Sequence, residues 1–150
     1  MKSFFLLLCT AALVTASGSC KKSNSGDDVS KLILGTWELS SSQASIIPTI
    51  NYPPGNGNLL KFTGSGYQSY TNGQLVKSGT YAIVADSTVE TSTGLIIPAG
   101  QFTHRIVYDG DNSGNKVFLQ VTGTELRFVS GYFPVDGGSG RLYAKQAADH

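Results

Sequence analysis

Apolar and polar residues alternate in short runs along most of this chain from residue 35 onward. In the first run, Trp37 and Leu39 fall on one face and Glu38 falls on the other. A period of two is the pattern of a β-strand that buries one face. Such runs occupy residues 35–42, 59–63, 67–70, 75–84, 101–108, 116–121, 125–129 and 141–145, and a weaker run occupies residues 87–97. The pattern predicts eight or nine strands and no convincing amphipathic helix.

Glycine, asparagine and aspartate separate these runs by short links. Asn72-Gly73 lies between two of the runs, and this dipeptide in that position is a strong hairpin signal. The composition agrees, because the 150 residues include 18 Gly, 7 Tyr and 7 Phe while only 14% are charged. A chain of this length is expected to form one core. We therefore predict an all-β fold, either an up-and-down barrel or a sandwich.

Residues 44–58 interrupt the pattern. Pro48, Pro53 and Pro54 cannot lie in a central strand, yet the same segment carries several apolar side chains. Long loops of this kind are often functional. We expect residues 46–52 either to form a flap over one end of the barrel or to plug that end with their apolar side chains.

The first residues have the pattern of a secretory signal. A short basic start is followed by an apolar run that gives way to small residues before Cys20. The run is too short to span a bilayer comfortably, because a spanning helix needs about 20 apolar residues. We predict a signal peptide over residues 1–19, and no other transmembrane candidate follows.

Cys20 has no second cysteine to pair with once the signal is removed. Residues 17–20 resemble a bacterial lipobox, which implies acylation of Cys20 and anchoring to the cell envelope. By the same resemblance, Lys21 in place of an aspartate after the cysteine implies sorting to the outer membrane. Ser17 stands where the motif usually has a branched aliphatic residue, and the alternative is ordinary secretion with Cys20 as a free thiol. Residues 20–31 are expected to be a lipidated cysteine and flexible tether, ahead of a domain over residues 32–150.

The balance of positive and negative residues limits the kinds of partner that are expected. Removal of Lys2 with the signal leaves 10 of the 11 Lys and Arg residues against 10 Asp and Glu residues. The mature chain is then nearly neutral and has no basic stripe, so nucleic acid is not an expected partner. We expect a monomer.

The segment 32–146 resembles the lipocalin-like domain of bacterial envelope lipoproteins. The resemblance rests on Gly35-x-Trp37 in the first strand, the long first loop, the series of hairpins and an aromatic and basic final strand. It implies a single antiparallel up-and-down barrel of about eight strands that binds a small apolar or amphipathic molecule without being an enzyme. In lipocalins a basic side chain of the last strand packs over this tryptophan. Lys145 is the first candidate for that closing contact and Arg141 the second, although Trp37 also fits a plain core aromatic.

An eight-stranded barrel is wide enough either to be filled by its own side chains or to hold one small ligand. A small-molecule site needs apolar walls with a few polar tips. Phe118 and the following residues are candidates to line such a cavity: Leu39, Ile47, Ile50, Tyr52, Phe62, Tyr67, Tyr81, His104, Tyr108 and Phe128. The same side chains could instead fill the core, so a filled barrel that serves as a surface interaction or structural module is the alternative function.

Patterns that would indicate catalysis or a metal are weak. Residues 109–114 begin like an EF-hand calcium loop, but Gln120 occupies the place of the bidentate glutamate, and a hairpin turn explains the same residues. His104 and His150 are too few and too separate for a zinc site, and we expect His104 to be a core imidazole. The chain has no Gly-x-Ser-x-Gly motif. We expect no enzyme activity, cofactor or metal.

Overall fold

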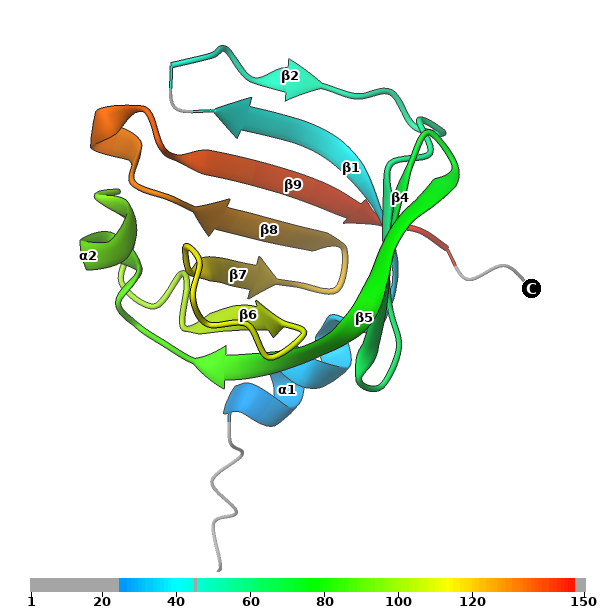
Figure 1. The fold of residues 1–150 in the computed structure, drawn as a ribbon, viewed down its shortest axis with the longest axis horizontal. Helices are drawn as coiled ribbons and strands as arrows, with labels where there is room; N and C mark the ends of the chain where they lie inside the picture. Colours follow the sequence, from blue (N-terminus) through cyan, green and yellow to red (C-terminus); the bar gives the residue numbers. More distant parts are fainter. Residues whose placement is uncertain (1–24, 45, 148–150) are drawn as a thin grey trace, which may run out of the picture.

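The structure, a computed structural model, describes residues 25–44 and 46–147. Its strands form one sheet that closes on itself into an antiparallel barrel of eight strands with one extra strand (Figure 1). The prediction of an all-β barrel is confirmed. The predicted signal peptide and Cys20 lie outside the described residues.

The strands follow one another around the barrel in chain order. They are β1 (Gly35–Ala44), β2 (Ile50–Asn51), β3 (Leu59–Phe62), β4 (Gly66–Thr71), β5 (Gln74–Ala85), β6 (His104–Tyr108), β7 (Val117–Val121), β8 (Glu125–Ser130) and β9 (Ser139–Lys145). From β3 to β9 each strand pairs antiparallel with the next, and β1 closes the barrel against β9. The other edge of β1 is shared, because its first residues pair with β3 and Ser41 and Ser42 pair with β2. The helical segments are α1 (Ser25–Leu32), α2 (Val89–Thr93) and a 3-10 turn, η1 (Phe133–Val135).

The barrel has two different ends. We call the end where β1 begins and β9 finishes the base, and the opposite end, where β1 finishes and β9 begins, the mouth. Trp37 and Leu126 are fully buried near the base, and Phe62 is nearly so. Large apolar side chains thus fill this half of the barrel.

Helix α1 packs beside β5 near the base (Figure 1). Ile33, just after the helix, is fully buried, and its carbonyl accepts a hydrogen bond of 2.7 Å from Trp37 Nε1. Val29 packs against the same core. The prediction of a flexible tether is therefore wrong for residues 25–31. Val29 and Ile33 are four residues apart, so both reach the same core, Val29 from within the helix and Ile33 from just after it.

A second apolar cluster lies outside the barrel, between β7 and β8 and the connection from β5 to β6. It consists of Val89, Phe102, Phe118 and Val129, with Leu95 and Ile97 packed against them. The weak strand predicted over residues 87–97 is wrong, because this segment contains α2 and covers the outer face of the sheet. The assignment of Phe118 to the cavity is wrong for the same reason: β7 is buried on both faces, so its apolar residues do not all point inward.

None of the helices within residues 25–44 and 46–147 is long and apolar enough to cross a membrane.

Candidate functional site

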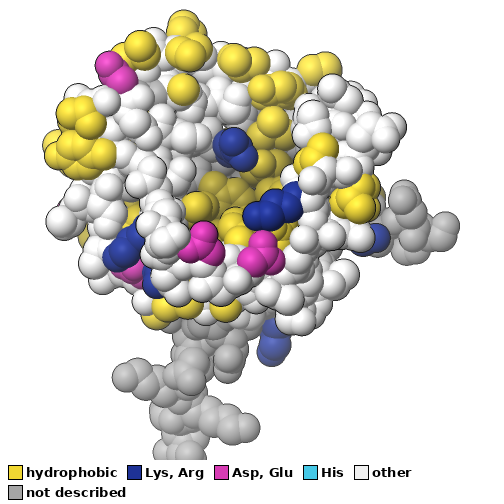
Figure 2. Space-filling view, viewed as in Figure 1, with side chains coloured by type: hydrophobic (Ala, Val, Ile, Leu, Met, Phe, Trp, Pro, Cys, Tyr) yellow, Lys and Arg dark blue, Asp and Glu magenta, His cyan; other side chains and the backbone are white. Residues whose placement is uncertain are grey.

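Two adjoining cavities open in the mouth half of the barrel. The outer chamber, about 380 Å³, has walls that include Leu39, Ile47, Ile50, Tyr52 and Leu59. The inner chamber, about 280 Å³, has walls that include Leu60, Tyr67, Tyr108, Val117 and Phe128. Figure 2 shows the hollow with hydrophobic side chains on its floor and Lys or Arg side chains beside it. Both chambers are lined by Ser69, Ser139, Arg141 and Tyr143, so these residues lie where the chambers meet.

The long first loop forms a wall of the outer chamber. The Tyr52 backbone N–H donates to the Ser40 carbonyl at 2.9 Å, and the Tyr52 hydroxyl lies 3.1 Å from Ser42 Oγ. Ile47 and Ile50 are half exposed, and Ile46 is 75% exposed. The loop therefore lies along β1 beside the hollow and leaves it open.

Glu38 fixes the second half of this loop. Its carboxylate accepts the backbone N–H groups of Gly55 at 3.0 Å and Gly57 at 3.2 Å, and the Gln146 side-chain amide at 3.1 Å. Glu38 points away from the barrel interior, as the alternation predicts, yet only 6% of it is exposed because the loop covers it. Three donors satisfy this buried carboxylate within the protein, and two of them belong to the loop, so Glu38 holds the loop against β1.

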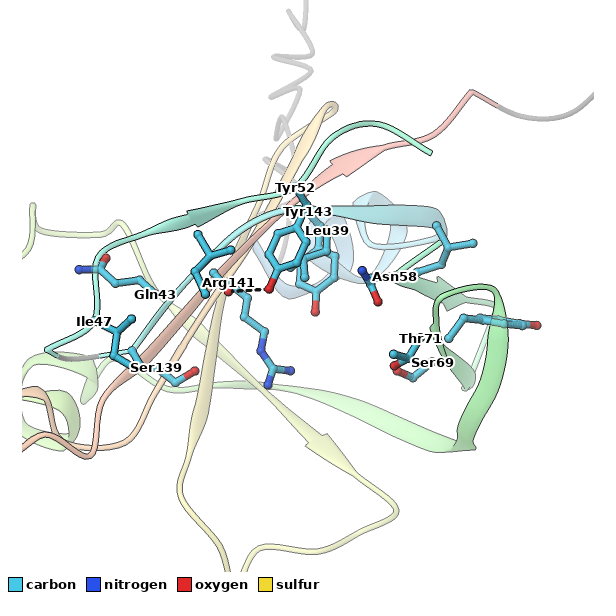
Figure 3. A pocket seen from close by; sticks show the side chains of 15 residues that line it. Leu39, Gln43, Ile47, Tyr52, Asn58, Ser69, Thr71, Ser139, Arg141 and Tyr143 are labelled. Atoms are coloured by element: carbon cyan, nitrogen blue, oxygen red, sulfur yellow. Dashed lines mark hydrogen bonds between the residues drawn. The ribbon is translucent and has the colours of Figure 1, made fainter. Parts of the chain in front are cut away.

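Arg141 and Tyr143 point from β9 into the hollow (Figure 3). Tyr143 is 5% exposed, and its ring meets Phe128 edge to face at 5.9 Å between centroids. Burial raises the pKa of Tyr143, and the interaction of its hydroxyl with Arg141 opposes that effect. The ion pairs in the described part of the chain join Lys77 to Asp109 and both Arg105 and Lys116 to Asp86. Arg141 belongs to none of them.

Lys77 also lines the inner chamber, but it has a partner. Its ammonium lies 3.3 Å from Asp109 Oδ2, which also accepts a hydrogen bond of 3.1 Å from the Tyr67 hydroxyl. Asp109 Oδ1 accepts the Thr80 backbone N–H at 2.9 Å. A side chain at Gly79 would collide with Asp109, so glycine there allows the close approach. The hydrogen bond from Thr80 is the largest influence on Asp109 and holds its pKa below the usual value.

The acidic residues of the turn after β6 accept hydrogen bonds from other groups of the protein. Asp109 is engaged as described, and Asp111 Oδ1 accepts the Ser113 backbone N–H at 2.8 Å and the Ser113 hydroxyl at 2.6 Å. Among the described residues, no group of three or more His, Cys, Asp or Glu side chains is placed to hold a metal ion. The contacts are those of a hairpin turn.

The structure brings together most of the residues suggested for a ligand site, in two groups. Leu39, Ile47, Ile50 and Tyr52 line the outer chamber, and Tyr67, Tyr108 and Phe128 line the inner one. Burial is the main reason that the pKa of Tyr108 is raised.

Phe62, Tyr81 and His104 line neither chamber. The Phe62 and Tyr81 rings pack edge to face at 5.0 Å, and the Tyr81 hydroxyl donates to the Thr63 carbonyl at 3.1 Å. His104 is 3% exposed, and its Nδ1 lies 2.8 Å from Thr103 Oγ1. These three side chains belong to the packed part of the barrel.

Lys145 is the basic residue that lies over Trp37. Its ammonium is 4.9 Å from the centroid of the Trp37 ring and donates to the Leu32 carbonyl at 3.2 Å. Arg141, the second candidate for that contact, lies four residues earlier on β9 and lines the hollow instead. Sequence reasoning also missed Tyr143, Ser69 and Lys77 as lining residues. The spacing of Arg141 and Tyr143 by two on a strand is a signal that the two side chains share a face.

Comparison of the chain with family models, with curated proteins and with solved structures finds no match.

Proposed function

We propose that this protein binds a small apolar or amphipathic molecule, non-covalently and without catalysis, in the two chambers of its barrel. The observation that carries the proposal is the hollow itself: two adjoining cavities whose walls combine apolar and aromatic side chains with hydroxyl, amide and basic ones. Small-molecule sites are concave and combine apolar walls with polar groups that orient the ligand. The dimensions also agree, because an eight-stranded barrel has room for one small ligand.

The proposal includes delivery to the cell envelope. A signal peptide over residues 1–19 followed by an acylated Cys20 would anchor the domain, and each buried CH₂ of an acyl chain contributes about 0.8 kcal/mol. Two or more chains therefore give stable attachment. The outer membrane is the proposed location, and the barrel would stand away from it on the segment that precedes α1.

Native mass spectrometry tests the binding. The Cys20→Ser form of the full chain, purified without denaturation from the organism that makes it, should carry a defined added mass that is lost on unfolding. Two further substitutions in that form provide a matched comparison. Ser69→Trp puts a large ring into both chambers, whereas Ser78→Trp puts the same ring on an exposed position of the neighbouring strand.

We expect the added mass to disappear in Ser69→Trp and to remain in Ser78→Trp. If the protein carries no added mass and also takes up no hydrophobic probe, the binding proposal fails and a surface interaction module becomes the better description. If Ser69→Trp keeps the full added mass while it remains folded, the molecule is bound elsewhere.

Membrane fractionation tests the anchor. The protein with Cys20 intact should sediment with membranes and dissolve only in detergent, and Cys20→Ser should be released. Retention of the variant in the membrane fraction would show that the attachment does not depend on this cysteine.

A further inference from the structure

The charged residues that line the chambers have one sign. Among the described residues they are Lys77 and Arg141, and neither chamber is lined by an Asp or a Glu. Lys77 is neutralised by Asp109 at 3.3 Å. Arg141 has no carboxylate partner in the described part of the chain, so the interior has an excess positive charge at this residue. A cleft lined by one sign of charge attracts ligands of the opposite sign.

Hydrogen-bonding groups converge around Arg141. Ser69, Ser139 and Tyr143 line the same junction between the chambers. The hydroxyls of Ser69 and Ser139 make no hydrogen bond within the described residues, and each can donate one. A guanidinium with free N–H groups beside two free hydroxyls is an arrangement suited to a small anion, because the planar fork of arginine matches a carboxylate in two parallel hydrogen bonds.

Apolar side chains adjoin this junction through the pairing of the strands, because Leu60 pairs with Ser69 and Phe128 pairs with Arg141. Leu60, Val117 and Phe128 are walls of the inner chamber, and the Phe128 ring contacts the Tyr143 ring that lies at the junction. A molecule with its polar end at Arg141 can therefore extend directly along apolar side chains. The site distinguishes two ends of a ligand, which a purely apolar cavity does not do.

From this arrangement we infer that the ligand is an amphiphile with a carboxylate head, which binds to the Arg141 guanidinium and the hydroxyls of Ser69 and Ser139 while its apolar part lies along Leu60, Val117 and Phe128. The inference rests on the proposed function and adds the chemical class of the ligand. Tyr143 lines the same junction, and its hydroxyl interacts with Arg141.

Calorimetric titration with two probes of equal chain length tests this assignment. Decanoate carries a carboxylate, decanol carries a neutral hydroxyl, and both are added to the Cys20→Ser form of the full chain, which needs no detergent. We expect decanoate to bind about tenfold more tightly or better, because hydrogen bonds to charged groups are the stronger ones. The preference should shrink as salt is added, since screening weakens the charge interaction.

The variants are Arg141→Gln and a matched control, Arg127→Gln, which removes an exposed arginine of β8 that lines neither chamber. Arg141→Gln should weaken decanoate binding about tenfold or more and leave decanol binding unchanged. Unchanged decanol binding also shows that the variant is folded. Arg127→Gln should bind both probes as the parent does.

Equal affinity of the parent for decanoate and decanol would overturn the inference while leaving the proposed function intact, and so would an Arg141→Gln variant that binds decanoate normally. Tighter binding of decyl phosphate than of decanoate would overturn the choice of a carboxylate. Absence of binding for all three probes would overturn the proposed function as well.

Discussion

Asp86 is a charged side chain on which the second apolar cluster, outside the barrel, depends. It follows β5 directly, and its side chain is 9% exposed. Oδ1 accepts the backbone N–H of Thr88 at 2.9 Å and the Thr88 hydroxyl at 2.6 Å. Oδ2 lies 3.2 Å from Arg105 Nε and 2.9 Å from Lys116 Nζ. The carboxylate thus joins the start of the segment that covers Phe118 to two neighbouring parts of the sheet.

The pKa of Asp86 gives the size of its contribution to the stability of the fold. Burial alone would raise it, but the hydrogen bonds from Thr88 and the contact with Lys116 outweigh burial and lower it from 3.8 to about 2. This difference corresponds to about 2.5 kcal/mol of stability at neutral pH. Lys116 is 41% exposed, so water screens part of the interaction, and we expect Asp86→Asn to cost about 1–2 kcal/mol.

The sign of the pH dependence follows from the direction of the shift. The folded protein holds the proton less tightly than the unfolded chain, so the carboxylate stabilises the fold above about pH 4 and loses that effect as the pH falls toward about 2. The free energy of unfolding in urea should therefore differ widely between the parent and Asp86→Asn at neutral pH, and only slightly at about pH 2. Asp111→Asn is the control, because Asp111 is exposed and bonds only within its own turn, to Ser113. A difference for Asp86→Asn that is the same at both pH values, or matched by the control, would refute the reasoning.

Two further substitutions test the packing at opposite sides of the barrel. Phe118→Ala removes a fully buried ring from the second apolar cluster and should lower the free energy of unfolding in urea by about 3–5 kcal/mol. Val76→Ala, at a position 59% exposed, should lower it little. Similar values for the two variants would contradict the assignment of a second core. Lys145→Met removes the cation over the indole of Trp37 and should cost about 1 kcal/mol and alter the emission spectrum of the single tryptophan, with the exposed Lys61→Met as control. An emission spectrum unchanged by Lys145→Met would mean that the contact does not form in solution.

The strands were predictable because alternation is a local property that each segment carries by itself. The inward residues of three runs, Trp37, Leu60 and Phe128, are buried as their pattern requires. The pattern failed where burial comes from distant segments. Phe118 faces outward because residues 86–103 cover it, and nothing within β7 indicates that cover.

The site was harder to predict because it depends on register. Whether Arg141 or Lys145 meets Trp37 is decided by the pairing of β1 with β9, which shifts at a bulge between Leu39 and Ser41. Alternation tells which side chains point inward, but it does not tell their height along the barrel. Tyr81 and Tyr108 pair directly across β5 and β6, yet only Tyr108 lines a chamber.

Side-chain size differs between the two halves of the barrel. Near the base, inward positions carry large residues such as Trp37, Phe62 and Leu126, which fill the available width. Toward the mouth, inward positions on β4, β8 and β9 carry serine: Ser69, Ser130 and Ser139 line the inner chamber. A barrel selected only for stability would place larger apolar groups at these positions, because each void forfeits packing energy. The small residues therefore leave space beside Arg141, and they leave its guanidinium accessible from the hollow.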